Sequence, residues 1–173
     1  VQYLVLTAGS RNPLVYQTNT HHQEYLWGEM KTFNIPLNDG STSQASLIYP
    51  VGWNPDKKYP AVVFYYENTA LYGMQYILPT IYNMGGFNST LFSISGFFVL
   101  YLDMRYKDTE VTKYLVSDTD DILDYVVKNE PTVNNDKLGM IGHSFGGFEV
   151  MYLAGKTNRF KAAVAGAGIA DLA

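Results

Sequence analysis

The sequence has 173 residues, a formal net charge of −4 and 47% apolar residues, which is enough to build the core of one ordinary domain. Its mild acidity argues against nucleic acid or an anionic membrane as a partner. The sequence contains no cysteine, which excludes disulfides and thiolate metal sites, and no apolar run approaches the roughly 20 residues of a membrane-spanning helix.

Strands and turn signals occupy most of the first half of the chain. Runs of apolar and β-branched residues are bounded there by Gly, Pro, Asn and Asp, which is typical of strands and their turns. We expect strands at residues 1–7, 13–18, 29–36, 44–49, 61–66 and 97–102. The last two runs are apolar throughout, as in parallel strands buried on both faces. Residues 75–84 are a candidate short helix. Another is expected to start at Asn88-Ser89-Thr90, capped by Ser or Asn, and to end at Gly96.

Helices and strands alternate in the second half. Apolar residues recur every three or four positions from Leu115 to Val126 and predict an amphipathic helix with Ser117 as its N-cap. Its aspartates are expected on a solvated face, because the glycine of a calcium-binding loop is missing; they are Asp118, Asp120, Asp121 and Asp124. A strand at 137–141, a helix at 147–154 and a strand at 160–167 follow. This order predicts an α/β fold, with a mostly parallel sheet and helices on both faces.

A Gly-x-Ser-x-Gly motif joins the strand that ends near Ile141 to the next helix. In this motif, a nucleophile elbow, Ser144 must adopt a strained backbone so that its hydroxyl stands clear. Gly142, Gly146 and Gly147 leave room for the neighbouring strand and helix. The first amides of the helix favour negative charge on an attacked carbonyl. The alternative interpretation is an ordinary glycine-rich turn, which the buried strand before it and the helical spacing after it argue against.

We expect neither a metal ion nor a cofactor. His21 and His22 are adjacent, and neighbouring side chains on an extended chain point in opposite directions. No carboxylate is spaced to complete a ligand set around them. We therefore interpret the pair as part of a solvated linker.

The motif and its surroundings resemble the prolyl oligopeptidase family of serine peptidases. Four further features are similar to that family: the run 25–29, the Asp39-Gly40 turn with the strand at 45–50, the run 58–60 before the strand ending in Tyr66, and the Asp120-x-x-x-Asp124 helix. The resemblance covers residues 25–171. It implies an α/β-hydrolase fold and hydrolysis of peptide bonds, with short peptides as substrates.

The resemblance assigns roles to two positions. Ser144 matches the nucleophile, and Tyr66 matches the tyrosine that forms the oxyanion hole together with the next amide after the serine, here that of Phe145. The expected end of a parallel strand at Tyr66 agrees, because ligands bind at the carboxyl edge of such sheets. The alternative for Tyr66 is a plain core or rim tyrosine. His143, beside the nucleophile, is interpreted as a packing residue.

The sequence departs from the family after Ser144. The triad of α/β-hydrolases runs Ser, acid, His along the chain, yet no histidine follows Ser144, and the later carboxylates are Glu149 and Asp171. We therefore expect a hydrolase domain that is incomplete at its C-terminal side and inactive alone. Residues 1–24 resemble the last strands and linker of a β-propeller, and 25–173 the N-terminal part of the hydrolase domain. The partners implied are the rest of that domain, the propeller and a peptide substrate.

Two other functions stay open. The chain could be a non-catalytic fragment that binds a peptide or another protein through the same cleft. It could also belong to an esterase, which uses the same elbow for another acyl group. The propeller-like residues 1–24 and Tyr66 favour the peptidase.

Overall fold

The computed structural model describes residues 3–5, 14–17, 20–75, 77–81, 87–106 and 112–170. Its centre is a six-stranded mixed sheet with the strand order β3-β4-β6-β5-β7-β8. The strands are β3 (Met30–Pro36), β4 (Thr42–Ile48), β5 (Tyr59–Tyr65), β6 (Phe98–Leu102), β7 (Val133–His143) and β8 (Phe160–Gly166). β3, β4 and β6 pair antiparallel, whereas β6, β5, β7 and β8 pair parallel. The sheet confirms the predicted α/β fold.

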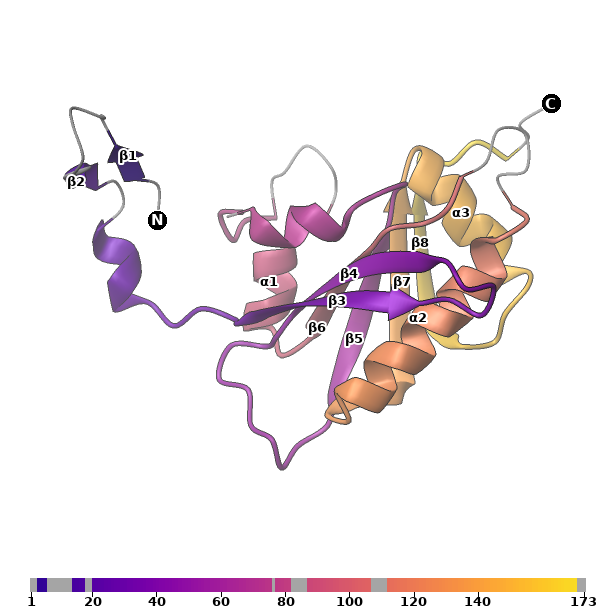
Figure 1. Cartoon of the computed structure of the whole chain (residues 1–173), viewed down its shortest axis with the longest axis horizontal. Coiled ribbons are helices and arrows are strands. Elements are labelled where there is room, and N and C mark those ends of the chain that lie inside the picture. Colours follow the sequence, from indigo (N-terminus) through magenta and orange to yellow (C-terminus); the bar gives the residue numbers. More distant parts are fainter. Residues whose placement is uncertain are drawn as a thin grey trace.

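Helices cover both faces of this sheet. Helix α1 (Ser89–Ile94) lies on one face, and α2 (Leu115–Asn129) and α3 (Phe145–Ala154) lie on the other (Figure 1). Strand β6 is buried from both sides: Phe98, Leu100 and Leu102 pack in the core under α2 and α3, and Val99 and Tyr101 pack in the core beside α1. This alternation explains why the strand reads as a continuous apolar run.

A small hairpin precedes the sheet. Strands β1 (Tyr3–Val5) and β2 (Leu14–Gln17) pair antiparallel and only with each other. A 3-10 helix, η1 (Thr20–Glu24), follows and leads into the sheet. A second 3-10 helix, η2 (Ala70–Met74), lies after β5. The two predicted N-terminal strands are thus present, within the bounds that the structure describes.

Two local predictions were wrong. Ser117 is not the N-cap of α2, because the helix begins two residues earlier, after Tyr114. No helix spans 75–84: the helical turn ends at Met74, and residues 76 and 82–84 lie outside the described residues. Pairing also extends β7 well before residue 137, since Tyr59 pairs with Val133.

The prediction of a solvated acidic face on α2 was wrong for Asp118. Its side chain is fully buried and forms a two-point ion pair with Arg105, in which Nε donates a hydrogen bond of 2.7 Å. Arg105 also binds Asp39 in the β3–β4 turn and stacks over Tyr114, 4.5 Å from the ring centre. The guanidinium therefore fastens the start of α2 to the sheet. The spacing of apolar and charged residues along the sequence cannot predict an ion pair that forms only when distant segments meet.

The other aspartates of α2 are more exposed. Arg159, just before β8, binds Asp124 at 2.6 Å and Asp120 at 3.3 Å.

None of the described helices combines the length and the apolar character that a bilayer crossing requires.

Candidate active site

Ser144 occupies a sharp corner between a buried strand and a helix. β7 ends at His143, α3 begins at Phe145, and Ser144 between them has φ 56° and ψ −119°. A non-glycine residue with positive φ is strained and persists only where its surroundings hold it. Two backbone hydrogen bonds do so: the Ser144 amide donates to the Gly166 carbonyl at 2.8 Å, and the Phe148 amide donates to the Ser144 carbonyl at 3.2 Å.

The three glycines around Ser144 are required by backbone contacts. A Cβ atom on Gly142 would lie 2.2 Å from the carbonyl oxygen of Gly146. A Cβ atom on Gly146 would lie 1.8 Å from the carbonyl oxygen of Tyr65, and one on Gly147 would lie 2.6 Å from that of Gly166. Real Cβ atoms do not approach this closely. The small residues let the first turn of α3 pack against the ends of β5 and β8.

Tyr66 lies at the same edge of the sheet as Ser144. Tyr65, the last residue of β5, pairs with Gly142 of β7, so Tyr66 follows β5 where the elbow follows β7. The Cα atom of Tyr66 is 3.4 Å from the position of a Cβ on Gly146, two residues after the serine. Its side chain is half-buried. The structure thus brings the backbone of Tyr66 next to the start of α3, where Phe145 is the first helical residue.

The first turn of α3 gives this corner its electrostatic character. The opening amides of a helix lack intrahelical partners and carry a partial positive charge. Phe145, Gly146 and Gly147 supply these amides, directly after the serine. Such a corner can stabilise an oxyanion that forms on a carbonyl attacked by the serine hydroxyl. His143 is exposed, and its ring packs toward Gly166 of β8.

A buried carboxylate lies one helical turn behind Phe145. Glu149 of α3 is fully buried, and its Oε1 accepts a hydrogen bond from the hydroxyl of Tyr106, whereas its Oε2 has no hydrogen-bond partner among the residues that the structure describes. Burial raises the pKa of Glu149 to about 7, although the Tyr106 hydrogen bond opposes the shift. Burial and the nearby carboxylate also raise the pKa of Tyr106.

Sequence reasoning did not select Glu149 or Tyr106. A signal was present, because Glu149 is the single charge in the otherwise apolar helix 145–154. A charge at such a position must be paired or neutralised when the helix is buried. The identity of its partner depends on the tertiary contact with the segment after β6.

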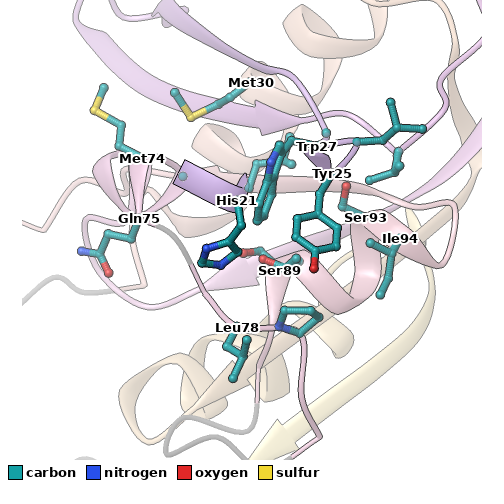
Figure 2. Close-up of a pocket in the computed structure, with 17 residues that line it drawn as sticks. His21, Tyr25, Trp27, Met30, Met74, Gln75, Leu78, Ser89, Ser93 and Ile94 are labelled. Atoms are coloured by element: carbon teal, nitrogen blue, oxygen red, sulfur yellow. The ribbon is translucent and has the colours of Figure 1, made fainter. Parts of the chain in front are cut away.

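A well-defined cavity lies away from the elbow. It has a volume of about 750 Å³ and is lined by residues of η1, the segment into β3, η2 and α1, none of which belongs to the Ser144 corner. Figure 2 shows Trp27 and Tyr25 next to Ser89, Ser93 and Ile94 of α1. It is a mostly apolar groove.

Among the residues that the structure describes, no group of three or more His, Cys, Asp or Glu side chains could hold a metal ion.

The sequence is similar to one family model and to named peptidases. The model of the prolyl oligopeptidase family matches residues 90–173. The chain is 29% identical over 157 residues to dipeptidyl-peptidase 5 of Porphyromonas gingivalis, covering 80% of this chain and 21% of that protein. It is 44% identical over 50 residues to the uncharacterized peptidase YuxL of Bacillus subtilis, covering 27% of this chain and 8% of that protein. The chain thus spans about a fifth, or less, of these relatives.

Solved structures share the fold. The chain matches the acylaminoacyl peptidase of Pyrococcus horikoshii with a TM-score of 0.68 and 16% identity, over 94% of this chain and 27% of that one. It matches dipeptidyl peptidase 4 of Porphyromonas gingivalis with a TM-score of 0.66 and 19% identity, over 98% of this chain and 25% of that one. At these identities the structures show the fold alone. The sequence matches show that the chain is similar to the prolyl oligopeptidase family.

Proposed function

We propose that this chain is the nucleophile-bearing part of a serine peptidase that hydrolyses short peptides. Ser144 attacks the scissile carbonyl, and the amide of Phe145 and the hydroxyl of Tyr66 stabilise the oxyanion. The observation that carries the proposal is the strained backbone of Ser144, φ 56° and ψ −119°, at the junction of β7 and α3. A plain strand-to-helix turn has no need for such a residue to be serine rather than glycine.

The base and the acid of the triad lie outside residues 1–173 in this proposal. A serine hydroxyl is a weak nucleophile at neutral pH until a base accepts its proton. All three histidines of the sequence, His21, His22 and His143, come before Ser144, whereas the triad order of this fold places the histidine after it. The 173-residue chain alone is therefore expected to be inactive.

We further propose that residues 1–24 end a β-propeller and that 25–173 begin the hydrolase domain. The supporting observation is that β1 and β2 pair only with each other and stay outside the six-stranded sheet. β8 is an edge strand of that sheet, and most of its residues are exposed. An uncovered edge invites pairing, which fits a sheet that continues in a longer protein.

A fluorophosphonate probe, which labels activated serines, tests the proposal on the full-length protein that contains this chain. We expect labelling of the full-length protein, loss of labelling in Ser144→Ala, and poor labelling of the isolated 173-residue chain. Ser95→Ala is a matched control, because Ser95 is exposed and lies at the end of α1. A folded full-length protein that does not label would instead support a peptide-binding or protein-binding role.

A substrate panel then separates peptidase from esterase. Dipeptide-releasing, acyl-peptide and internally cleaved peptides would be compared with short-chain esters of the same acyl groups. We expect kcat/KM to be highest for one of the peptide classes. Hydrolysis of the esters alone would assign the elbow to an esterase.

A further inference from the structure

Glu149, which is buried, and Tyr106, which is partly buried, form a hydrogen-bonded pair close to the start of α3. Glu149 points into the core from α3, four residues after Phe145 and therefore on the same side of the helix. Tyr106, in the segment after β6, donates its hydroxyl to Glu149 Oε1. The pair thus links the elbow helix to a segment that is 43 residues away in the sequence.

The same tyrosine also contacts the first residue of the helix. The ring of Tyr106 packs edge-on against the ring of Phe145, with 5.6 Å between their centres. Phe145 carries the amide assigned to the oxyanion hole. The position of Tyr106 therefore limits where the Phe145 side chain, and with it the start of α3, can lie.

The backbone at Glu67, directly after Tyr66, is bound to the segment that carries Tyr106. Glu67 has a positive φ of 46°, although it is not glycine, and its carbonyl accepts a hydrogen bond of 3.3 Å from the Met104 amide. The backbone of Glu67 also lowers the pKa of Glu149, which opposes the effect of burial. The strained corner beside Tyr66 is thus held against the segment that also carries Tyr106.

We propose that Glu149 and Tyr106 are positioning residues, which fix the Phe145 amide and the Tyr66 corner in the geometry that receives the oxyanion. This inference rests on the proposed peptidase function. A buried carboxyl is costly to the stability of an otherwise apolar helix, because burial removes it from water. The free-energy cost of burying Glu149 is explained if its hydrogen bond with Tyr106 holds the Phe145 amide and the Tyr66 corner in place. Donors to an oxyanion must be fixed before the reaction begins.

Three variants of the full-length protein test the proposal. Tyr106→Phe removes only the hydroxyl, Glu149→Met removes the acceptor at similar size, and Glu149→Gln keeps an acceptor for Tyr106. Active sites would be counted by fluorophosphonate labelling, and kcat and KM measured with the best peptide of the substrate panel. We expect Tyr106→Phe and Glu149→Met to lower kcat per labelled site about tenfold with KM within twofold, and Glu149→Gln to stay within threefold of wild type. Tyr72→Phe, an exposed tyrosine on η2, is the control.

The outcomes separate this inference from the proposed function. If the wild-type protein labels and cleaves peptides, but Tyr106→Phe keeps its kcat per labelled site, the pair is structural only and the inference fails. Loss of folded protein with unchanged kcat per site leads to the same conclusion. Tyr106→Phe keeps its ring and is expected to fold even if Glu149→Met does not. A wild-type protein that is folded, unlabelled and inactive contradicts the proposed function itself.

Discussion

Gly146 packs directly on Tyr65, so that a Cβ atom on the glycine would lie 1.8 Å from the tyrosine carbonyl oxygen. This contact sets the distance between α3 and β5, the strand that ends beside Tyr66. No side-chain rotation can relieve this contact, because the backbone fixes the positions of both the Cβ atom and the carbonyl oxygen. The close approach of the elbow to the backbone beside Tyr66 therefore depends on the absence of a Cβ atom at Gly146.

The first prediction concerns that contact. Gly146→Ala should force α3 away from β5, lowering the free energy of unfolding by about 2 kcal/mol or more. Fluorophosphonate labelling of the full-length protein should fall by at least about tenfold, because small displacements of an oxyanion donor are costly. Gly155→Ala is the matched control at the other end of α3: its Cβ would meet nothing closer than 3.6 Å, and its φ of −87° suits alanine. Equal effects of the two substitutions would refute the steric explanation.

The second prediction concerns Tyr66. If its hydroxyl donates to the oxyanion, Tyr66→Phe should lower kcat for peptides about 100-fold, while KM changes little. The variant should keep the thermal stability of the wild-type protein, since the side chain is only half-buried. A change confined to KM would assign Tyr66 to substrate binding. No change at all would make it the plain rim tyrosine of the alternative interpretation.

The third prediction concerns the ion pair that fastens α2. Asp118→Asn should lower the free energy of unfolding by about 3 kcal/mol, because it leaves the partly buried Arg105 without its buried partner. Asp124→Asn lies on the same helix, has a side chain that is 71% exposed, and should cost no more than about 0.5 kcal/mol. Urea unfolding of the two variants measures the difference. Similar costs would show that burial of Asp118 does not matter.

The sequence was sufficient for the elements that have strong local signals. Apolar composition predicted β5 and β6, the spacing of apolar residues predicted the helix after Leu115, and a motif predicted the turn at Ser144. Their order alone predicts the parallel part of the sheet. The β3–β4 hairpin turns at Asp39-Gly40, between the strands predicted at 29–36 and 44–49.

The sequence was insufficient where distant segments meet. Asp118 belongs to a run of aspartates that is typical of a solvated helix face. It becomes a core residue only because Arg105 approaches it from the segment after β6. Glu149 is similar, since its partner Tyr106 is 43 residues away. The first turn of α2 also begins earlier than Ser117 suggested, because its start is held by tertiary contacts rather than by a cap.

The fourth prediction concerns the pH dependence of stability through Glu149. Burial and the neighbouring Glu67 carboxylate raise its pKa from 4.5 to about 7 in the folded protein. The folded state therefore binds the proton more tightly than the unfolded state, so stability is highest below pH 4.5 and is lost as pH rises toward 7. Tyr106 and Tyr65 also face this carboxylate, but burial raises the pKa of each hydroxyl, so neither titrates in this range.

Glu149→Gln removes this dependence. Compared with wild type, the variant should gain stability progressively between pH 4.5 and 7, by about 1 to 3 kcal/mol in total, and the difference should level off above pH 7. Urea unfolding at intervals from pH 4.5 to 8 measures it, with Glu24→Gln, at an exposed position of η1, as the control. A constant difference across that range would mean that Glu149 is already ionised in the folded protein at low pH, and that its burial costs less than the structure indicates.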